Sequence, residues 1–337
     1  MRIAVDAMGG DFAPREIVKG ALKAARELPS VTRIFLVGDE SAIRAELGPE
    51  DAQNEKLEIV HATEVVGMDE APAQAVRRKK DSSIGRAVDL VKAGRADAVV
   101  SAGNTGAVVV ASTLKLRTLE GVDRPAIAAV LPTQKQPIVL IDAGANTDCT
   151  PKMLGHFAAM GSVYSRMIMH AENPVVGLVS IGGEDIKGNE FTKETFKLLE
   201  SSPLNFKGNV EGHDIFEGNM DVAVCDGFVG NIILKTAESV SHAMAHWMKR
   251  EFVKTPIRMF GAAILKGAFR DMKKTMDPEM HGGALLLGVN GVCIITHGAS
   301  SERAIFHAVR VAAESVELDL NTAIVERVAA VNGAISE

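Results

Sequence analysis

The chain has 337 residues, of which 47% are hydrophobic, and its formal net charge is −6 at pH 7. A chain of this length and apolar content can bury a large core, as one α/β domain or as two lobes. The negative charge, the single Trp and the single Tyr argue against nucleic acid as a partner, because that binding needs cations and aromatic stacking platforms.

The cysteines and the apolar segments indicate where the protein works. Cys149, Cys225 and Cys293 lie far apart and form no CxxC pair, which favours reduced thiols over a disulfide framework or a zinc site. The first residues lead directly into a strand pattern, without the apolar region of a signal peptide. Residues 280–301 are the longest stretch without Asp, Glu, Lys or Arg, but they are too rich in glycine for a membrane span. We therefore expect a cytoplasmic protein.

In chain order, the apolar pattern alternates between short strands and helices. Strands are predicted at residues 3–5, 34–37, 57–60 and 98–100, and a helix at residues 14–28. This alternation predicts an open, largely parallel sheet. Ligands of such sheets bind beyond the carboxyl ends of the strands, so the segments that follow the strands are the candidate sites.

Two strands of the first half end in polar turns that contain glycine. The first strand leads into Asp6, Gly9 and Gly10, and the strand at 98–100 leads into residues 101–106, Ser-Ala-Gly-Asn-Thr-Gly. Glycine lets the main chain approach a ligand closely, and the bare N–H groups of such a turn can bind an anion. For either turn alone, an ordinary strand-to-helix loop is the competing interpretation.

Two strands of the second half, predicted at 138–141 and 222–225, end in the same way. The first leads into Asp142-Ala-Gly-Ala-Asn146, and the second into Asp226-Gly-Phe-Val-Gly-Asn231, with a long helix predicted from Ile232. If the sheet brings all four strand ends to one edge, they form a cleft rich in main-chain donors. Such a cleft suits phosphate, or a carbonyl oxygen that gains negative charge.

A further polar loop follows the strand predicted at 175–181 and contains Gly182, Gly183 and Lys187. A lysine in this position can neutralise a phosphate or a developing oxyanion. It can equally be a solvated lysine paired with Glu184 or Glu190, and the spacing alone leaves both interpretations open.

Several well-known motifs are absent from the sequence. It contains no GxGxxG, no Walker loop, no HExxH and no GxSxG, so neither a nucleotide cofactor nor a zinc or serine hydrolase is indicated. Cys225 is a weak candidate for an acyl-accepting thiolate, because the adjacent Asp226 disfavours the thiolate and strand cysteines are usually buried.

Two basic segments stand out from the acidic average. Residues 77–80, Arg-Arg-Lys-Lys, are most simply a solvated helix end, with an acidic partner as the alternative. Residues 240–276 form a basic amphipathic helical region in which Pro256 separates two helices. Such helices can lie on an anionic membrane, bind an acidic protein or form a dimer contact, and these alternatives stay open. The candidate surface cations of this region are Lys249, Arg250, Lys254, Arg258, Lys266 and Arg270.

Eight motifs, in order and over essentially the whole chain, closely resemble the phosphate acyltransferase family of bacterial phospholipid synthesis. They are AVDAMGGD, SAGNTGA, DAGAN, GNEFTKET, NVEG, VCDGFVGN, GGALLLGV and THGASS. The resemblance implies a three-layer α/β/α sandwich with a mostly parallel sheet, related to phosphotransacetylases and isopropylmalate-type dehydrogenases. Residues 1–337 would then form a single catalytic unit, as one body or as two lobes around a central cleft.

The resemblance also implies an activity and its partners. The family transfers a long-chain acyl group from acyl carrier protein to inorganic phosphate, and the acyl phosphate then serves a glycerol-3-phosphate acyltransferase. A homodimer is implied, associated peripherally with the inner face of the cell membrane, without a metal or organic cofactor.

The family's motifs indicate which residues perform the reaction. Lys187 and Asn231 are the catalytic candidates: Lys187 would pair with phosphate or the oxyanion, and Asn231 would donate to the carbonyl oxygen. The candidates for binding phosphate or substrate are Asp6, Gly9, Gly10, Gly103, Asn104, Thr105, Gly106, Asp142, Asn146, Gly182, Gly183, Asp226, Gly227, Gly230, His297 and Gly298.

Three positions depart from the family pattern. Pro278 follows Asp277 where a tyrosine is usual, Leu285 follows Ala284 where a proline is usual, and His213 replaces an arginine. Two other functions remain to be distinguished: a soluble phosphotransacetylase for short acyl-CoA, and a noncatalytic membrane scaffold. The motif set favours the long-chain enzyme, and a scaffold would leave the four strand ends unexplained.

Overall fold

A single sheet of eleven strands runs through the protein. The computed structural model describes residues 1–275 and 278–336, so Met276 and Asp277, at and just beyond the end of the basic region, lie outside the described residues. The strand order in the sheet is β3-β2-β1-β4-β11-β10-β5-β6-β9-β7-β8. The strands are β1 (Arg2–Asp6), β2 (Arg33–Gly38), β3 (Leu57–His61), β4 (Ala98–Ser101), β5 (Ala126–Leu131), β6 (Ile138–Ile141), β7 (Val175–Val179), β8 (Asn205–Val210), β9 (Val222–Val224), β10 (Ala284–Leu287) and β11 (Val292–Ile295).

The direction of the strands changes in the middle of the sheet. β10 pairs antiparallel with β11 and with β5, and β5 pairs antiparallel with β6, whereas all other neighbours are parallel. The direction therefore reverses three times between β11 and β6. As a result, β6, β9, β7 and β8 run opposite to β1, β2, β3, β4 and β11. The predicted parallel character is confirmed within each half, but the central reversal was not predicted.

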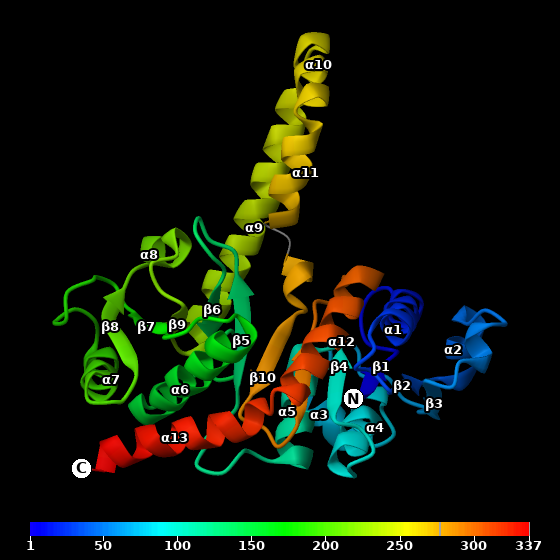
Figure 1. Cartoon of the computed structure of the whole chain (residues 1–337), viewed down its shortest axis with the longest axis horizontal. Coiled ribbons are helices and arrows are strands. Elements are labelled where there is room, and N and C mark those ends of the chain that lie inside the picture. Colours follow the sequence, from blue (N-terminus) through cyan, green and yellow to red (C-terminus); the bar gives the residue numbers. More distant parts are fainter. Residues whose placement is uncertain (276–277, 337) are drawn as a thin grey trace.

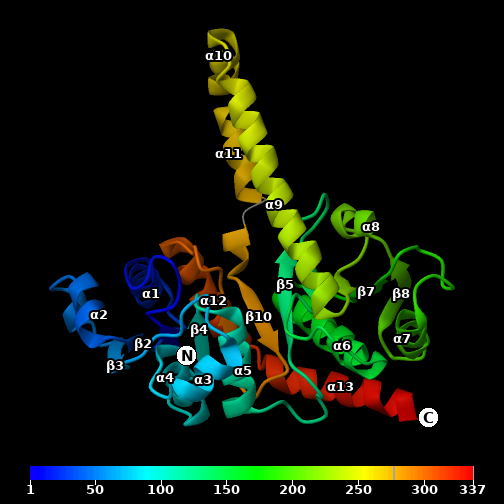
Figure 2. The same cartoon turned by 180° about the vertical axis from the view of Figure 1, so that it is seen from behind.

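Helices cover both faces of the sheet, as the two opposite views show (Figures 1 and 2). In β1, Ile3 and Val5 pack into a core cluster with α1, α6, α12 and α13, while Ala4 between them faces α4 and α5. This alternation confirms the three-layer sandwich. The α-helices are α1 (Arg15–Glu27), α2 (Glu40–Glu46), α3 (Pro72–Arg78), α4 (Ser83–Lys92), α5 (Thr105–Leu116), α6 (Pro151–Ile168), α7 (Glu190–Glu200), α8 (Gly212–Glu217), α9 (Gly227–Phe252), α10 (Pro256–Ile264), α11 (Lys266–Thr275), α12 (Glu302–Glu317) and α13 (Leu320–Ser336), with short 3-10 helices η1 (Asp51–Gln53) and η2 (Pro278–His281).

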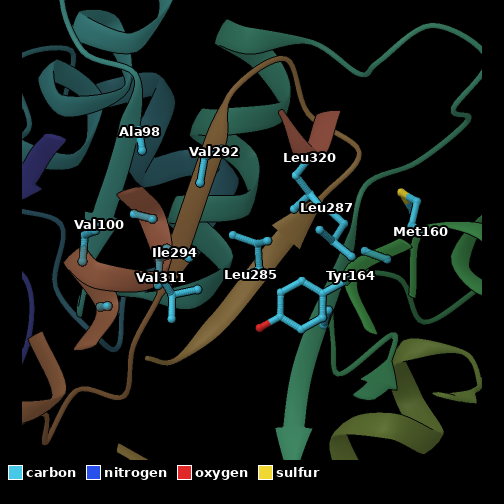
Figure 3. Close-up of a cluster of buried hydrophobic side chains, with 14 of the residues drawn as sticks. Ala98, Val100, Met160, Tyr164, Leu285, Leu287, Val292, Ile294, Val311 and Leu320 are labelled. Atoms are coloured by element: carbon cyan, nitrogen blue, oxygen red, sulfur yellow. The ribbon is translucent and has the colours of Figure 1, made fainter. Parts of the chain in front are cut away.

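The reversed strand β10 is held by the core as well as by its hydrogen bonds. Leu285 and Leu287 are buried on the side of the sheet that Tyr164 and Met160 of α6 cover (Figure 3). Tyr164 is the largest fully buried side chain among the described residues. Burying side chains of this size contributes about 1.5–3 kcal/mol each, so the centre of the sheet, where the two halves meet, is firmly packed.

The basic region forms an arm that projects from the body of the protein. α9 starts on the sheet, leaves the body and is followed by α10 and α11, which turn back along it (Figures 1 and 2). The rings of Phe252 in α9 and Phe269 in α11 lie 4.9 Å apart between centroids, so the two helices pack side by side. Pro256 opens α10, as the sequence predicted. None of the described helices is long and apolar enough to cross a membrane.

Candidate functional site

The four glycine-containing strand ends lie at two opposite edges of the sheet. The expectation that they share one edge is wrong, because β6 and β9 run opposite to β1 and β4. We call the residues that follow β1, β4 and β11 the Asp6 edge. The residues that follow β6, β9 and β7 form the Asn231 edge.

At the Asp6 edge, a buried carboxylate joins two parallel strands. The Ser101 hydroxyl, at the end of β4, donates a 2.7 Å hydrogen bond to Oδ2 of Asp6, at the end of β1, and the Met8 N–H donates to Oδ1 over 3.3 Å. Asp6 is almost completely buried, and this burial raises the pKa of its carboxyl, while bonds from the Ser83 and Ser101 hydroxyls act in the opposite direction. Asp6 thus fixes the two turns relative to each other.

Glycines allow the turns of the Asp6 edge to pack backbone against backbone. A Cβ atom on Gly9 would lie 2.7 Å from the main-chain nitrogen of Gly103, and one on Gly10 would lie 2.9 Å from the carbonyl oxygen of Gly298. Gly10 also has a φ of 103°, a conformation that other residues rarely adopt. The neighbouring His297 is exposed, and its Nδ1 accepts a hydrogen bond from the Ala299 N–H.

The Asn104 side chain is fully occupied by the protein itself. Its Oδ1 accepts the Ala107 N–H and so caps α5, while its Nδ2 donates to the carbonyl oxygens of Gly67, Met68 and Glu70 at 3.1–3.2 Å. The donors that this turn can still offer are therefore backbone N–H groups at the start of α5, including those of Thr105 and Gly106.

At the Asn231 edge, the Asp142 carboxylate organises the loop that follows β6. Asp142 is fully buried and accepts main-chain N–H bonds at 2.7–3.1 Å from Ile127, Gly144, Ala145 and Asn146, together with the side-chain amide of Asn146. Burial raises the pKa of Asp142, and these donors oppose that shift. Through these bonds Asp142 holds the loop in place.

The helix α9 begins five residues earlier than predicted. Asp226 caps it by accepting the Val229 N–H at 2.9 Å, so Gly227 and Gly230 lie inside the first turns of the helix. A Cβ on Gly227 would lie 2.6 Å from the carbonyl oxygen of Asn146. The two glycines therefore let the helix start directly against the Asp142 loop, with exposed Asn231 beside Gly144.

Lys187 lies on the neighbouring loop of the same edge. Its aliphatic part covers Gly182, whose Cβ would lie 2.9 Å from Cγ of Lys187. The side chain is exposed and forms no ion pair with Glu184, Glu190 or any other described residue. The structure therefore does not support the interpretation of Lys187 as one half of a surface ion pair. Because β6, β9 and β7 are parallel neighbours in the sheet, the Lys187 loop and the Asn231 turn begin at the same edge.

The sequence analysis overlooked two polar groups under the Lys187 loop. Ser180 Oγ, directly after β7, and Asn209 Oδ1, near the end of β8, are buried and have no hydrogen-bond partner in the structure. Asn209 Nδ2 donates to the carbonyl oxygen of Glu184 at 2.9 Å, which ties β8 to the loop. Buried polar atoms without partners are uncommon in proteins, and a catalytic role or an ordered water are among their explanations. An asparagine inside a strand, next to Gly208, was the available signal.

The two edges share one face of the sheet although they lie at opposite ends of its strands. Ala107 and Val108 of α5 and Ala143 of the Asp142 loop belong to one buried apolar cluster, and Leu234 of α9 packs against it. Helix α5 starts at the Asp6 edge and α9 starts at the Asn231 edge. The two helices therefore lie on the same face of the sheet.

Cys225 lacks the surroundings of a reactive thiol. It is buried, with Sγ 3.8 Å from the carbonyl oxygen of Asp142, and burial together with Asp226 and Asp142 raises its pKa well above the ordinary value. The thiolate that an acyl transfer to sulfur requires is therefore strongly disfavoured.

Comparison with known proteins gives consistent results. The sequence model of the family described as "Fatty acid synthesis protein" matches residues 1–323. Phosphate acyltransferase from Pelotomaculum thermopropionicum is 52% identical over 94% of this chain and 92% of that protein, and the one from Desulforamulus reducens is 51% identical over 97% of each.

Among solved structures, a phosphotransacetylase from Streptococcus pyogenes matches with a TM-score of 0.62 and 17% identity over 94% of each chain. The EutD phosphotransacetylase from Staphylococcus aureus matches with a TM-score of 0.59 and 15% identity over 94% of each chain. These likenesses confirm the expected relation to the phosphotransacetylase fold. The family match and the relatives of about 50% identity identify the chain more closely: it belongs to the fatty acid synthesis protein family and is an acyltransferase.

Proposed function

We propose that this enzyme transfers a long-chain acyl group from acyl carrier protein to inorganic phosphate, and that Lys187 and Asn231 act on the reacting atoms. The observation that supports the proposal is the parallel strand order β6-β9-β7, from which the Asn231 turn and the Lys187 loop begin at one edge of the sheet. One loop offers an exposed cation that has no ion-pair partner among the described residues, and the other offers an exposed amide at a helix start.

For this reaction the enzyme has to position phosphate against the thioester and stabilise the charge that develops. A phosphate oxygen attacks the thioester carbonyl, a tetrahedral oxyanion forms, and the C–S bond then breaks, so that acyl phosphate and the carrier thiol leave. Phosphate is already a nucleophile, so the enzyme must hold it against the carbonyl carbon. Lys187 balances the charge of the phosphate or the oxyanion, and the Asn231 amide donates to the carbonyl oxygen.

The surroundings of Asn231 suit an acyl group. Phe228 and Ile232, three residues before and one after it, are 60% and 49% exposed and lie on the same side of α9, because residues four apart are neighbours on a helix. Exposed apolar side chains beside a polar donor fit a thioester with an alkyl chain better than a short, soluble acyl group.

The backbone donors of the Asp6 edge complete the proposed substrate site. They lie on the face of the sheet that also carries α9, and they suit anionic groups of the acyl donor or phosphate. In this proposal the glycines and Asn104 shape the surface, and their role is to position the substrate.

The arm provides a surface for an anionic membrane. Ile257, Phe260 and Ile264 of α10 are 84%, 71% and 69% exposed, and their spacing places them on one side of the helix. Lys249 and Arg250 nearby form no ion pair among the described residues, whereas Lys254 and Arg258 both pair with Glu251. Apolar side chains rimmed by cations are typical of helices that lie on anionic lipid, and we propose this role for the arm, with α9 also available to a second copy in a homodimer.

The proposed activity can be measured with the purified protein, acyl carrier protein thioester and phosphate. We expect phosphate-dependent loss of the thioester, with acetyl-CoA a poor donor. Lys187→Ala and Asn231→Ala should each lower turnover about tenfold or more, as the loss of a transition-state donor commonly does, without lowering the melting temperature. No phosphate-dependent turnover in the wild type would refute the activity, and near-normal rates in both variants would refute the assignment of the two residues.

A further inference from the structure

The basic run at the end of α3 presents cations that the protein does not use. Arg77, Arg78 and Lys80 are exposed and form no ion pair with any described residue, whereas Lys79 between them bonds to Glu70 and to the Val65 carbonyl oxygen. Three positive charges within four residues therefore face solvent.

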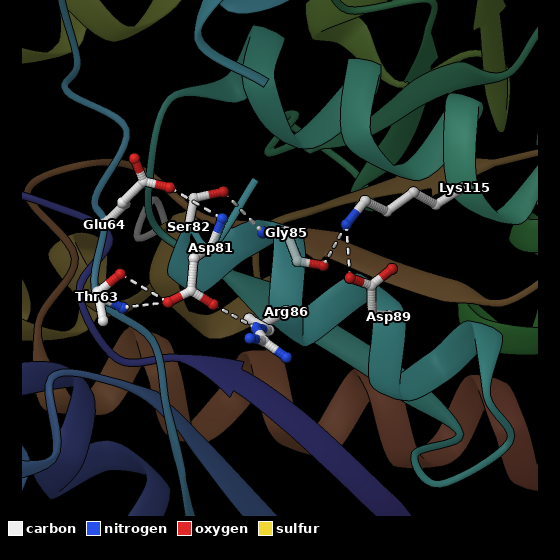
Figure 4. Close-up of polar contacts among 8 residues, drawn as sticks. All are labelled: Thr63, Glu64, Asp81, Ser82, Gly85, Arg86, Asp89 and Lys115. Carbon is white, nitrogen blue, oxygen red and sulfur yellow. Dashed lines mark hydrogen bonds and ion pairs between the residues drawn. The ribbon is translucent and has the colours of Figure 1, made fainter. Parts of the chain in front are cut away.

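Asp81, which directly follows the run, and Glu64 are both occupied by other partners (Figure 4). Asp81, directly after Lys80, accepts the Thr63 hydroxyl at 2.6 Å and the Arg86 guanidinium at 2.5 Å. These bonds lower the pKa of Asp81 to about 2, so its charge is present at neutral pH but is directed away from the run. Glu64 accepts the N–H of Asp81 at 2.9 Å.

The same network orders the backbone that follows the three cations. The segment of residues 63–64 and that of residues 81–86 are joined by the contacts of Asp81 and Glu64, and Lys115 of α5 bonds to Asp89 of α4 at 2.7 Å. A charged surface that is already ordered loses less entropy when a partner binds.

The other end of α3 touches the candidate substrate site. A Cβ on Gly106 would lie 2.5 Å from Cγ of Pro72, the first residue of α3, so this helix packs against the first turn of α5. Asn104 also holds the loop that precedes α3 through the carbonyl oxygens of Gly67, Met68 and Glu70. Because α3 has seven residues, the run lies about 10 Å along the helix from Pro72, which contacts the first turn of α5.

The basic surface of α3 is less apolar than that of the arm. The loop beside it exposes Val65 and Met68 at 40% and 50%, whereas the arm exposes Trp247, Ile257 and Phe260 at 55%, 84% and 71% next to its cations. A surface on which cations outnumber exposed apolar side chains suits an acidic protein, where charge complementarity guides association, better than a lipid layer that takes up apolar side chains.

We propose that Arg77, Arg78 and Lys80 form the docking surface for the acidic carrier protein that delivers the acyl thioester, which rests on the proposed function. Docking there places the carrier beside the Asp6 edge, from which its flexible prosthetic group can extend over the face shared by α5 and α9. In this arrangement the arm remains available to bind the membrane.

The test uses two variants, each with two charge reversals, and assays them with two acyl donors. Arg77→Glu with Arg78→Glu should raise KM for acyl carrier protein thioester about tenfold, and kcat/KM for the small soluble acyl-pantetheine thioester should stay within about twofold. The matched control, Lys249→Glu with Arg250→Glu on the arm, should keep the wild-type KM for the carrier thioester but bind less to vesicles that contain anionic phospholipid. Melting temperatures verify that both variants are folded.

The possible results separate this proposal from the proposed function. An unchanged KM for the carrier thioester in the α3 variant, or an equal rise for both donors, would overturn the docking surface. Loss of vesicle binding by the α3 variant with an unchanged KM would assign the run to lipid and also overturn it. If the wild type shows no turnover, the proposed function fails. In that case docking is tested by surface plasmon resonance with the carrier protein. We expect salt-sensitive binding of the carrier to the wild type and at least about tenfold weaker binding to the α3 variant, and equal binding to both would overturn the docking surface.

Discussion

Helix α9 approaches the end of β6 so closely that a Cβ atom on Gly230 would lie 1.9 Å from the carbonyl oxygen of Asp142. The obstacle is main chain, which cannot move aside as a flexible side chain can. Gly230→Ala should therefore push the first turn of α9 away from the Asp142 loop and displace Asn231. Overpacking of this kind costs about 1–3 kcal/mol, and we expect a lower melting temperature together with at least about tenfold lower turnover.

A glycine in the arm provides the matched control. Gly261 lies inside α10, and a Cβ there would meet no atom within 4 Å. Alanine is a better helix former than glycine by about 1 kcal/mol, so Gly261→Ala should keep or raise stability and leave turnover unchanged. Equal behaviour of the two variants in thermal unfolding and in the assay would contradict the close packing at Gly230.

Much of the fold could be predicted from the sequence because its signals are local. Apolar runs, each followed by a glycine, predicted the strands near β1, β4, β6 and β9. Pro256 predicted the boundary between two helices of the arm. The reversal at β10 could not be predicted in this way, since the pattern of Leu285, Leu286 and Leu287 shows burial but not direction. The direction of a strand depends on which strands it pairs with, and here the three antiparallel pairs between β11 and β6 set the direction of the second half of the sheet.

The candidate site was predictable in its residue types but not in its grouping. Asp142 and Asp6 both follow strands, yet they lie at opposite edges because β6 runs against β1. The start of α9 was misplaced because Gly227 and Gly230 read as a turn, whereas the contact with the Asp142 loop requires glycine inside the helix. Asn209 was overlooked because an asparagine within a strand shows its importance only when its buried oxygen is seen without a partner.

Asn104 should act on substrate binding through the loop that it holds. Asn104→Ala removes the cap of α5 and three bonds to residues 67–70, so we expect a loss of stability of about 1–2 kcal/mol and a rise in KM larger than any fall in kcat. Asn104→Asp separates the two roles: it keeps the cap but places an oxygen against three carbonyl oxygens. A pure kcat defect in either variant would place the Asn104 side chain in the chemical step.

Asp6 should make stability fall as the pH rises from acid. Its pKa is raised in the folded protein, so the folded state keeps a proton that the unfolded chain, with a pKa of about 3.9, has already lost. The folded state is thus favoured most below the unfolded pKa, and this contribution is lost as the pH increases through the folded pKa. Asp6→Asn can keep the bonds to Ser101 and Met8, because the hydroxyl can accept as well as donate.

The comparison is made by thermal unfolding of wild type and Asp6→Asn from pH 4 to pH 8. We expect the melting temperature of the wild type to fall relative to that of the variant as the pH rises from 4, just above the pKa of the unfolded carboxyl, through the raised pKa of Asp6. If the melting temperature of the wild type instead rises relative to that of the variant over this range, the folded protein stabilises the carboxylate of Asp6. That result would contradict a raised pKa caused by burial.

Cys225 should be dispensable for the reaction, because direct attack by phosphate needs no acyl-enzyme. Its thiol is buried and its pKa is raised by that burial, so Cys225→Ala should cost about 1 kcal/mol of stability for the atom removed and leave turnover within about threefold. Mass spectrometry after incubation with acyl carrier protein thioester, without phosphate, should show no acyl group on the enzyme. A folded Cys225→Ala protein with a hundredfold lower rate, or an acyl adduct on Cys225 in the wild type, would replace direct transfer by a two-step mechanism through sulfur.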